Sequence, residues 1–324
     1  FNSAANFLLN FKMSSASFQI AVTSPAFCKS KFLCKKLKKY FPHTAFNEKG
    51  RYLNSKELID FLKEKDAAIV GRDIIGKTEL RLLPQLRIIS KYGVGLDNID
   101  KAALKKHNVK LCWTPGINKR SVAELTLCFM LGMFHNVFST GNYLKKGIWK
   151  KQGGNEISEK QIGIIGCGNV GKEVIKMLKT FNAKIKVNDI LDISEFCLEQ
   201  KIKAVTFKEI VESSDLISLH IPLTENTRNL INQKVLERMK SSAYLINTSR
   251  GEVVNNSALK RALKTNRIAG ASLDVFNQEP PDDMELLSLP NIMVTPHIGG
   301  NAEEAVKAMG QSAINHLVDF FAAN

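Results

Sequence analysis

Three glycines in the segment GCGNVG indicate a site for a dinucleotide. Gly166 ends an apolar run that begins at residue 161, and Gly168 and Gly171 lead into a helical pattern that reaches residue 181. In such a loop the first glycine permits a tight turn, the second lets the backbone approach a pyrophosphate, and the third lets the helix pack on the strand. The positive end of the helix dipole then faces the phosphates. A plain glycine turn is the alternative, but the strand before and the helix after favour phosphate binding.

Asp189 bears on which nucleotide the loop binds. It lies at the end of the next predicted strand, 18 residues after Gly171, close to the spacing of a ribose-binding acid. A carboxylate there accepts hydrogen bonds from a ribose 2′-hydroxyl and repels a 2′-phosphate. No arginine follows within residues 190–192. The sequence therefore favours NAD over NADP, with a surface aspartate as the alternative.

Three side chains further along the chain are suited to act on an organic acid. Arg250 follows a predicted strand, where ligands gather in open α/β sheets, and its guanidinium could hold a carboxylate and polarise a carbonyl. A surface ion pair with Glu252 is the alternative. His297 could exchange a proton near neutral pH, although a lone histidine is more often structural. Glu279 lies in a loop before two prolines, where a glutamate would ordinarily be solvated.

The elements that must position these residues alternate between strands and helices. In the first part of the chain, strands are predicted at 18–23, 67–71, 87–93 and 109–113. Helical patterns cover 29–40, 55–64 and 100–107, with Ser55 as an N-cap. In the second part, strands are predicted at 161–166, 184–189, 216–222, 243–249, 268–274 and 291–296. The alternation predicts an α/β protein with two Rossmann-like, doubly wound parallel-sheet domains and a cleft between them.

The domain boundaries are expected near residues 118 and 298. One domain would combine 1–117 with 299–324, including a last helix at 301–323, and the other would span 118–298. The segment 121–134 is apolar on most of its helical surface, so it should be buried between elements or between subunits. This helix makes a homodimer the expected assembly.

Composition excludes some classes of protein. The 324 residues are 44% hydrophobic, yet no run approaches the roughly 18 apolar residues of a membrane span, so no membrane partner is expected. The net charge is +15, and the densest basic cluster is Lys29, Lys31, Lys35, Lys36, Lys38 and Lys39. Apolar residues interleave these lysines at helical spacing, which predicts an amphipathic helix with a solvated lysine face. No nucleic-acid-binding motif accompanies the cluster, so no nucleic-acid partner is expected.

The six cysteines indicate neither a disulfide framework nor a metal site. They form no C-x-x-C pair and no zinc-ligand spacing, so no metal is expected. Cys112 and Cys128 lie in apolar runs and are predicted to be buried. Free thiols suit a reducing compartment, and we expect the cytoplasm.

The start of the chain has no acidic residue before Glu48 and no methionine before Met13. Ser-rich, acid-poor starts occur in transit peptides. Because a strand is expected by Phe18, we interpret the preceding residues as an extended or truncated start.

Seven motifs in order give the chain a clear resemblance over residues 18–323. They are KYGVGLDNID (91–100), TPGINKRSVAEL (114–125), GCGNVG (166–171), LHIPLTENTRNLIN (219–232), LINTSRGEVV (245–254), ASLDVFNQEP (271–280) and TPHIGG (295–300). The sequence resembles the D-isomer-specific 2-hydroxyacid dehydrogenases, in particular phosphoglycerate dehydrogenase-like members of the short form without a regulatory domain.

The resemblance implies a role for each matching residue. Arg250 would bind the substrate carboxylate and keto oxygen, His297 would exchange the proton, and Glu279 would pair with His297. The backbone amides of Val94 and Gly95 would hold the substrate carboxylate. Cofactor contacts are implied for Gly166, Gly168, Gly171, Asn169, Val170, Asp189, Ser121, His220, Ile221, Pro222, Thr227, Thr248, Ser249, Asp274, Gly299 and Gly300.

The implied reaction is a NAD-dependent hydride transfer between a D-2-hydroxy acid and its 2-keto acid. Lys91 stands where phosphoglycerate-type relatives usually carry arginine, and it keeps the charge without the guanidinium fork. Lys91 therefore hints at 3-phosphoglycerate, with a solvated lysine as the alternative. Hydroxypyruvate or glyoxylate reduction stays open. So does a NAD-sensing role like that of corepressors that share this fold.

Overall fold

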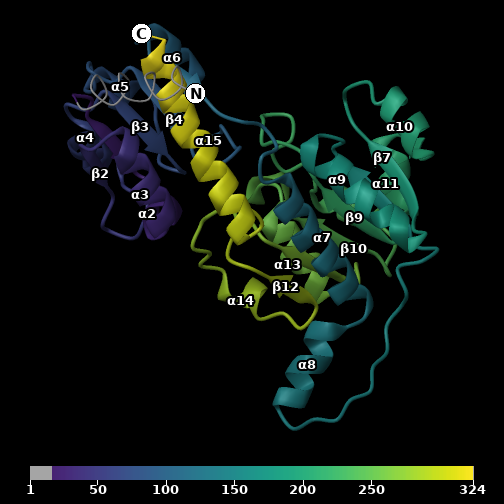
Figure 1. Cartoon of the computed structure of the whole chain (residues 1–324). Coiled ribbons are helices and arrows are strands. Elements are labelled where there is room, and N and C mark those ends of the chain that lie inside the picture. The colour runs from purple at the N-terminus through teal and green to yellow at the C-terminus, as the bar shows by residue number, and fades with distance from the viewer. Residues whose placement is uncertain (1–16, 324) are drawn as a thin grey trace. The chain divides into compact units, whose positions relative to one another are not determined.

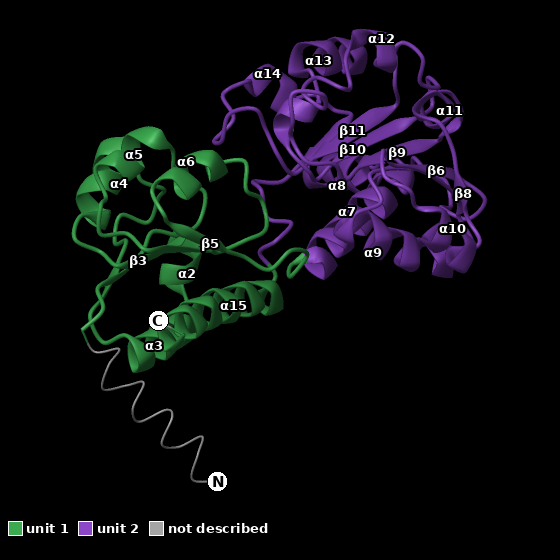
Figure 2. Cartoon of the chain, turned by 90° about the horizontal axis from the view of Figure 1, so that it is seen from above, with its two compact units in different colours: residues 1–118, 302–324 green, residues 119–301 purple. Residues whose placement is uncertain are grey.

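Runs of β-branched residues form the strands of two separate parallel sheets. The computed structural model describes residues 17–323, so the segment ahead of the first strand lies mostly outside the described residues. Unit 1 comprises Phe1–Asn118 with Ala302–Asn324, and unit 2 comprises Lys119–Asn301 (Figure 2). The predicted α/β class with two doubly wound parallel sheets is confirmed.

Unit 1 is built on a five-stranded parallel sheet. Its strands are β1 (Ile20–Val22), β2 (Thr44–Phe46), β3 (Ala67–Val70), β4 (Ile88–Lys91) and β5 (Lys110–Cys112). Their order is β2-β1-β3-β4-β5. Three of them, β2, β3 and β4, are labelled in Figure 1. From β1 the chain first adds β2 on one side and then adds β3, β4 and β5 on the other. The strand order therefore reverses between β1 and β3. Ligands in open α/β sheets gather at such a point.

Helices cover both faces of this sheet. They are α2 (Pro25–Lys29), α3 (Lys31–Tyr40), α4 (Ser55–Leu62), α5 (Lys77–Arg81), α6 (Lys101–Lys106) and α15 (Glu303–Ala322). One core layer joins α2, α3 and the C-terminal α15 to the sheet. The other joins α4, α5 and α6 to it. The helix α15, at the C-terminal end, therefore completes a core that is otherwise formed by residues near the N-terminal end.

Unit 2 is built on a seven-stranded parallel sheet. Its strands are β6 (Gln161–Ile165), β7 (Lys184–Asn188), β8 (Lys203–Ala204), β9 (Leu216–Leu219), β10 (Tyr244–Asn247), β11 (Gly270–Leu273) and β12 (Ile292–Val294). Their order is β12-β11-β10-β9-β6-β7-β8. The sheet changes direction between β6 and β9, beside the predicted glycine loop.

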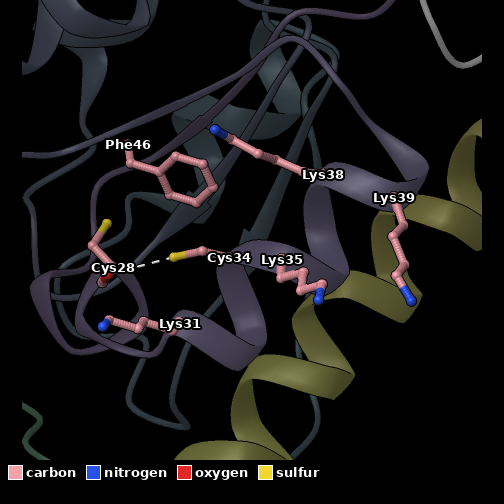
Figure 3. Close-up of a pocket in the computed structure, with 7 residues that line it drawn as sticks. All are labelled: Cys28, Lys31, Cys34, Lys35, Lys38, Lys39 and Phe46. Carbon is pink, nitrogen blue, oxygen red and sulfur yellow. Dashed lines mark hydrogen bonds between the residues drawn. The ribbon is translucent and has the colours of Figure 1, made fainter.

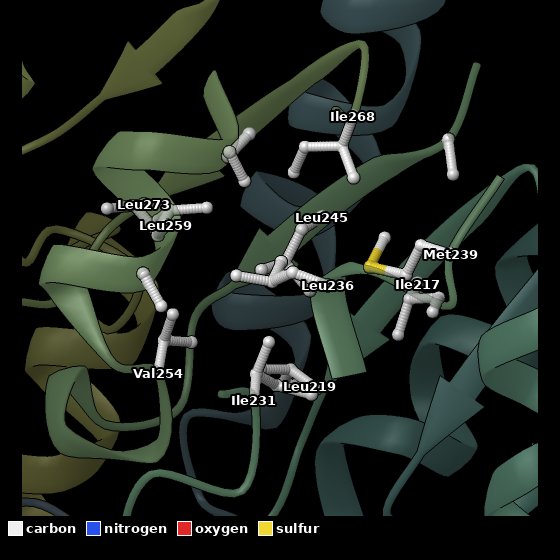
Figure 4. Packing of buried hydrophobic residues seen from close by; sticks show 14 of the residues in the cluster. Ile217, Leu219, Ile231, Leu236, Met239, Leu245, Val254, Leu259, Ile268 and Leu273 are labelled. Carbon is white, nitrogen blue, oxygen red and sulfur yellow. The ribbon is translucent and has the colours of Figure 1, made fainter. Parts of the chain in front are cut away.

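Two core layers flank the sheet of unit 2. Its helices are α7 (Lys119–Phe134), α8 (Val137–Lys145), α9 (Asn169–Leu178), α10 (Ser194–Gln200), α11 (Phe207–Ser213), α12 (Gln233–Leu236), α13 (Asn256–Lys264) and α14 (Met284–Leu287), with 3₁₀ turns η1 (Lys179–Phe181) and η2 (Gly251–Val253). One layer contains side chains of α7, α9 and α10. The other contains side chains of α11, α12 and α13 and includes the aliphatic cluster of Figure 4. The sheet is therefore buried on both faces, as its apolar strands require.

Some local expectations were wrong. The helix predicted at 29–40 is two helices, because Ser30 leaves the helical conformation and its hydroxyl accepts a hydrogen bond from the Leu33 amide. The N-cap of α4 is Asn54 rather than Ser55, because Asn54 forms a reciprocal capping box with Glu57. Cys128 is exposed rather than buried, and Cys112 is half-buried.

Within residues 17–323 no single helix is long and apolar enough to span a membrane. Only α7 and α8 together would be long and apolar enough, and the two helices are bent by 67° relative to each other.

Candidate active site

The glycine loop after β6 has the geometry of a phosphate-binding turn. Gly166 has φ +97°, and a Cβ there would lie 2.4 Å from the carbonyl oxygen of His220. A Cβ on Gly171 would lie 2.0 Å from the carbonyl oxygen of Gly166, so α9 can approach β6 only with glycine there. A Cβ on Gly168 would meet no atom within 4 Å. Two of the glycines therefore serve packing, and the open space is at Gly168.

The N-terminus of α9 is open to an anion. Gly168 is the N-cap and supplies no side-chain acceptor. Within the described residues, the amides of Asn169 and Val170 donate no hydrogen bond. Free amides at the positive end of a helix dipole fit a pyrophosphate.

Asp189 lies directly after β7 and holds the glycine loop. Its Oδ2 accepts a hydrogen bond from the Cys167 amide at 2.6 Å, and its Oδ1 accepts one from the Leu191 amide at 2.9 Å. The carboxylate is half-buried, so it remains accessible. The residues present thus fit a dinucleotide, with amides for the pyrophosphate and a carboxylate beside them for a ribose.

Asn247 positions the loop after β10, and the sequence reasoning missed it. It is fully buried, and its Nδ2 donates to the Arg250 carbonyl at 2.7 Å. Its Oδ1 accepts from the Ser249 amide at 3.0 Å and from the Ser249 hydroxyl at 2.7 Å. The hydroxyls of Thr248 and Thr126 lie 3.1 Å apart. A buried asparagine at a strand end was the available signal for this role.

Glu279 and His297 form a close pair. The Nδ1 atom of His297 lies 2.9 Å from Oε2 and 3.0 Å from Oε1 of Glu279. The Glu279 side chain is 14% exposed and that of His297 is 31% exposed, so the pair is only partly screened by water. The opposite ring nitrogen, Nε2 of His297, makes no hydrogen bond within the described residues. The pair can thus offer Nε2 to a reacting group while Glu279 fixes the ring through Nδ1.

Asp274 fixes the backbone that carries His297. Its Oδ1 accepts from the Thr295 hydroxyl at 2.6 Å and from the Ile298 amide at 2.7 Å, and its Oδ2 accepts from the Gly299 amide at 2.8 Å. Burial raises the pKa of Asp274. His297 has φ +55°, a left-handed conformation that costs a non-glycine residue roughly 1 kcal/mol. The bonds to Asp274 hold the chain in that turn.

Three further predicted residues lie where α7 meets the turn after β12. The hydroxyl of Ser121 on α7 donates to the Gly299 carbonyl at 2.5 Å, so Ser121 links α7 to the turn after β12. Gly299 is buried and Gly300 is half-buried.

The loop after β9 lies against the glycine loop. The Ile221 side chain lies 2.8 Å from the position of a Cβ on Gly166. The Thr227 hydroxyl donates to the Pro222 carbonyl at 2.7 Å, which closes the loop. His220 lies 2.9 Å from the Ser218 hydroxyl through Nε2, and burial lowers the pKa of His220 to about 3. His220 is therefore a neutral ring at physiological pH.

The predicted substrate residues of unit 1 are Lys91, the last residue of β4, and Val94 and Gly95 in the turn that follows. The Val94 and Gly95 amides donate no hydrogen bond within the described residues, so this turn offers two consecutive donors. Lys91 is only 5% exposed, and its ammonium donates to the Gly71 carbonyl and, at 2.7 Å, to Oδ1 of Asn98.

The structure brings most predicted residues of unit 2 to the carboxyl ends of its strands. Gly166, Asp189, His220, Thr248 and Asp274 each follow a strand end directly or within one residue. Within the described residues no group of three or more histidine, cysteine, aspartate or glutamate side chains could hold a metal ion.

The chain is similar to proteins of one known family. Residues 127–299 match the model of the D-isomer specific 2-hydroxyacid dehydrogenase NAD binding domain. A glyoxylate reductase of Korarchaeum cryptofilum is 34% identical over 275 residues, which cover 82% of this chain and 83% of that protein. A D-3-phosphoglycerate dehydrogenase of Methanocaldococcus jannaschii is 37% identical over 267 residues, which cover 80% of this chain but only 50% of that protein.

A solved structure is similar over almost the whole chain. The D-lactate dehydrogenase of Aquifex aeolicus, complexed with NAD and lactic acid, has a TM-score of 0.81 and 26% identity, and the match covers 93% of this chain and 94% of that one. The chain belongs to the D-isomer-specific 2-hydroxyacid dehydrogenase family. It is a NAD-dependent oxidoreductase that interconverts a D-2-hydroxy acid and its 2-keto acid.

Proposed function

We propose that the chain reduces a short 2-keto acid, such as glyoxylate or hydroxypyruvate, with NADH. The Glu279–His297 pair carries this proposal, because it leaves Nε2 of His297 available to a substrate oxygen. Bound NADH supplies the hydride, and the chain's own residues supply positioning, charge and the proton.

His297 is the proposed acid. With Nδ1 held by Glu279, the charged imidazole donates its Nε2 proton to the keto oxygen during reduction. In the oxidative direction the neutral ring accepts the same proton. Glu279 fixes the orientation of the ring through its contact with Nδ1.

Arg250 is the proposed carboxylate ligand. Its guanidinium can form two parallel hydrogen bonds to a carboxylate and lower the energy of charge on the adjacent oxygen. The hydrogen bond from Asn247 to the Arg250 carbonyl fixes the backbone from which this side chain extends. The Val94 and Gly95 amides are proposed as further carboxylate donors.

The residues proposed to hold NAD are those of the open loop. The amides of Asn169 and Val170 would bind the pyrophosphate, and Asp189 would bind a ribose. We propose that Ser121, His220 to Pro222, Thr227, Thr248, Ser249, Asp274, Gly299 and Gly300 line the rest of that site. Accordingly, 118–298 would be the NAD-binding domain, and 1–117 with 299–324 would be the substrate-binding domain.

The environment of Lys91 supports a short substrate over a phosphorylated one. Its ammonium is buried and donates to Gly71 and Asn98, which leaves little of it for a phosphate. The named glyoxylate reductase supports the same choice, whereas the named phosphoglycerate dehydrogenase supports the alternative.

The deciding experiment measures NADH oxidation with glyoxylate, hydroxypyruvate and phosphohydroxypyruvate, compared as kcat/KM. We expect the two unphosphorylated acids to exceed the phosphorylated one by at least tenfold. A preference for phosphohydroxypyruvate would reverse the assignment of substrate and leave the assignment of reaction class intact.

We also propose a homodimer formed through α7 and α8. Every residue of α8 is at least partly exposed, and Val137, Phe138, Leu144 and Trp149 are 55%, 47%, 57% and 79% exposed. Such an apolar patch is typical of an interface. Sedimentation should give a dimer, and Phe138→Asp should give monomers. Leu198→Asp, at an even more exposed apolar residue on α10, should leave the dimer intact. A monomeric native protein would exclude this interface.

A reducing compartment such as the cytoplasm is the proposed location, because all six cysteines are free. Imaging of the tagged full-length protein tests this directly, and an oxidising compartment would contradict it.

A further inference from the structure

Unit 1 contains a hollow that none of the proposed catalytic roles uses. It lies between α3 and the edge strand β2, is shallow and largely open to solvent, and has a volume of about 600 Å³. We call it the lysine hollow, and it is lined by Cys28, Lys31, Cys34, Lys35, Lys38, Lys39 and Phe46 (Figure 3).

The rim of the lysine hollow is strongly cationic. Lys31, Lys35 and Lys38 recur at intervals of four and three residues, which places their side chains along one side of α3. Among residues 17–323 none of the four lining lysines forms an ion pair. By contrast, nearby Lys49 and Arg51 share the Glu57 carboxylate, each at 2.6 Å. Like charges at this spacing repel, and the repulsion would be relieved by an anion between them.

The floor of the hollow adds no negative charge to balance the rim. Burial raises the pKa of Cys28 to about 11 and also raises that of Cys34, so both thiols stay protonated at neutral pH. The Cys28 thiol lies 3.6 Å from the Val22 carbonyl oxygen, and the Cys34 thiol lies 3.4 Å from that of Cys28. The nearby carboxylate of Asp73 is buried and bonded to the Thr23 hydroxyl at 2.5 Å.

An aromatic ring forms one wall. Lys38 extends towards Phe46, and its ammonium lies 5.4 Å from the ring centroid (Figure 3). Phe46 is half-buried, so part of its ring remains available to a ligand. A neutral floor, an aromatic wall and several ammonium groups suit an anion with an apolar part.

We propose that the lysine hollow binds an oligophosphate group, either free or carried by a nucleotide. Ammonium groups are good phosphate ligands because they act as compact point charges with three donors. All four lysines belong to one short helix, α3, so their charges match the length of a compact ligand better than that of an extended nucleic-acid backbone. This site lies at the β2 edge of unit 1 and is formed by none of the residues proposed to bind NAD.

The test uses the full chain saturated with NADH, so that the dinucleotide site is filled. Calorimetric titration with tripolyphosphate, and separately with ATP, at about 0.15 M salt should give one site per chain with Kd below about 1 mM. Lys35→Gln/Lys38→Gln should raise that Kd at least tenfold, because two charge-assisted contacts are lost. Lys36→Gln/Lys105→Gln is the matched control: it removes the same charge outside the hollow and should change Kd less than threefold.

The two probes distinguish the two sources of the phosphate. Equal affinity for tripolyphosphate and ATP would indicate recognition of phosphate alone. Tighter binding of ATP that is weakened by Phe46→Leu would indicate a nucleotide. The proposal is overturned by no binding up to about 5 mM, by equal losses in the Lys35/Lys38 and control variants, or by binding of duplex DNA alone.

Discussion

The first strand-to-helix connection differs between the two units, although both follow a strand at which the sheet changes direction. In unit 1 the connection after β1 is closed by the chain itself. Ser24 caps α2 by accepting a hydrogen bond from the Phe27 amide, and Pro25, which has no amide hydrogen, occupies the first turn. In unit 2 the connection after β6 is open, because Gly168 supplies no cap and the next amides stay free.

This difference shows how one architecture can serve as a scaffold or as a binding site. A capped helix start satisfies its own donors and has little left for a ligand. An uncapped start beside glycine keeps the donors and the space for an anion. The residues at the strand ends, rather than the sheets, therefore separate the two units in function.

The largest expected effect concerns the histidines of the two units. His297→Ala in unit 2 should lower kcat about a thousandfold, because proton transfer to the keto oxygen is lost, while the Kd for NADH changes less than threefold. His316→Ala in unit 1 is the control and should keep kcat within about threefold. Steady-state kinetics measures kcat, and fluorescence titration measures the Kd for NADH. A His297→Ala enzyme that kept a tenth of its kcat would refute the proposed acid.

The next effect comes from giving unit 2 the cap that unit 1 has. Gly168→Ser should raise the Kd for NADH at least tenfold, because the serine oxygen would occupy amides needed by the pyrophosphate. A Cβ at this position meets no atom within 4 Å, so the thermal midpoint should not fall. Unchanged NADH affinity would show that the open helix end is not the pyrophosphate site.

A smaller effect is expected on the pH dependence of the free energy of unfolding. The pKa of His220 is lowered to about 3 by burial, and the pKa of His316 in unit 1 is also lowered by burial. Below about pH 6.5 the unfolded histidines bind protons that the folded ones do not, so stability falls as the pH falls from 6.5 towards 3. We expect His220 to contribute about 1 kcal/mol per pH unit in this window. Urea denaturation at pH 7 and pH 5 measures the slope, which should flatten in His220→Gln.

The smallest effect is removal of the cap in unit 1. Ser24→Ala should lower the free energy of unfolding by about 1 kcal/mol, since the Phe27 amide loses its acceptor. NADH affinity should stay the same, as measured by fluorescence titration. A change in that affinity would mean that the capped connection also serves the cofactor.

The apolar strands and the glycine loop could be predicted because their signals are local. The short edge strands β2 and β8 could not, since an edge strand needs neither length nor a continuous apolar run. Asn54 was missed as a cap because Ser55 beside it is an equally good candidate, and only the reciprocal bonds with Glu57 decide. Cys128 was misplaced because an apolar neighbourhood in sequence does not reveal which side of α7 faces outwards.

Contacts between residues that are distant in sequence were harder still to predict. The Glu279–His297 pairing was expected only from the resemblance, since 18 residues separate the two. Thr295 was missed because its bond to Asp274 exists only once the loops after β11 and β12 lie side by side. Asn247 bonds within its own loop, to Ser249 and Arg250, but the sequence does not show that its side chain turns back onto that loop.

The position of α15 has a consequence for the order of events during synthesis. Met309, Ala313, Leu317 and Phe321 of this helix belong to the core of unit 1, and a Cβ on Gly310 would lie 2.2 Å from Leu33. All residues of unit 2 leave the ribosome before α15 does. The sheet of unit 2 can therefore be complete while the core of unit 1 still lacks α15. Unit 1 can therefore close only after unit 2 has been synthesised, and until then the apolar side chains of α2 and α3 that pack on α15 stay uncovered.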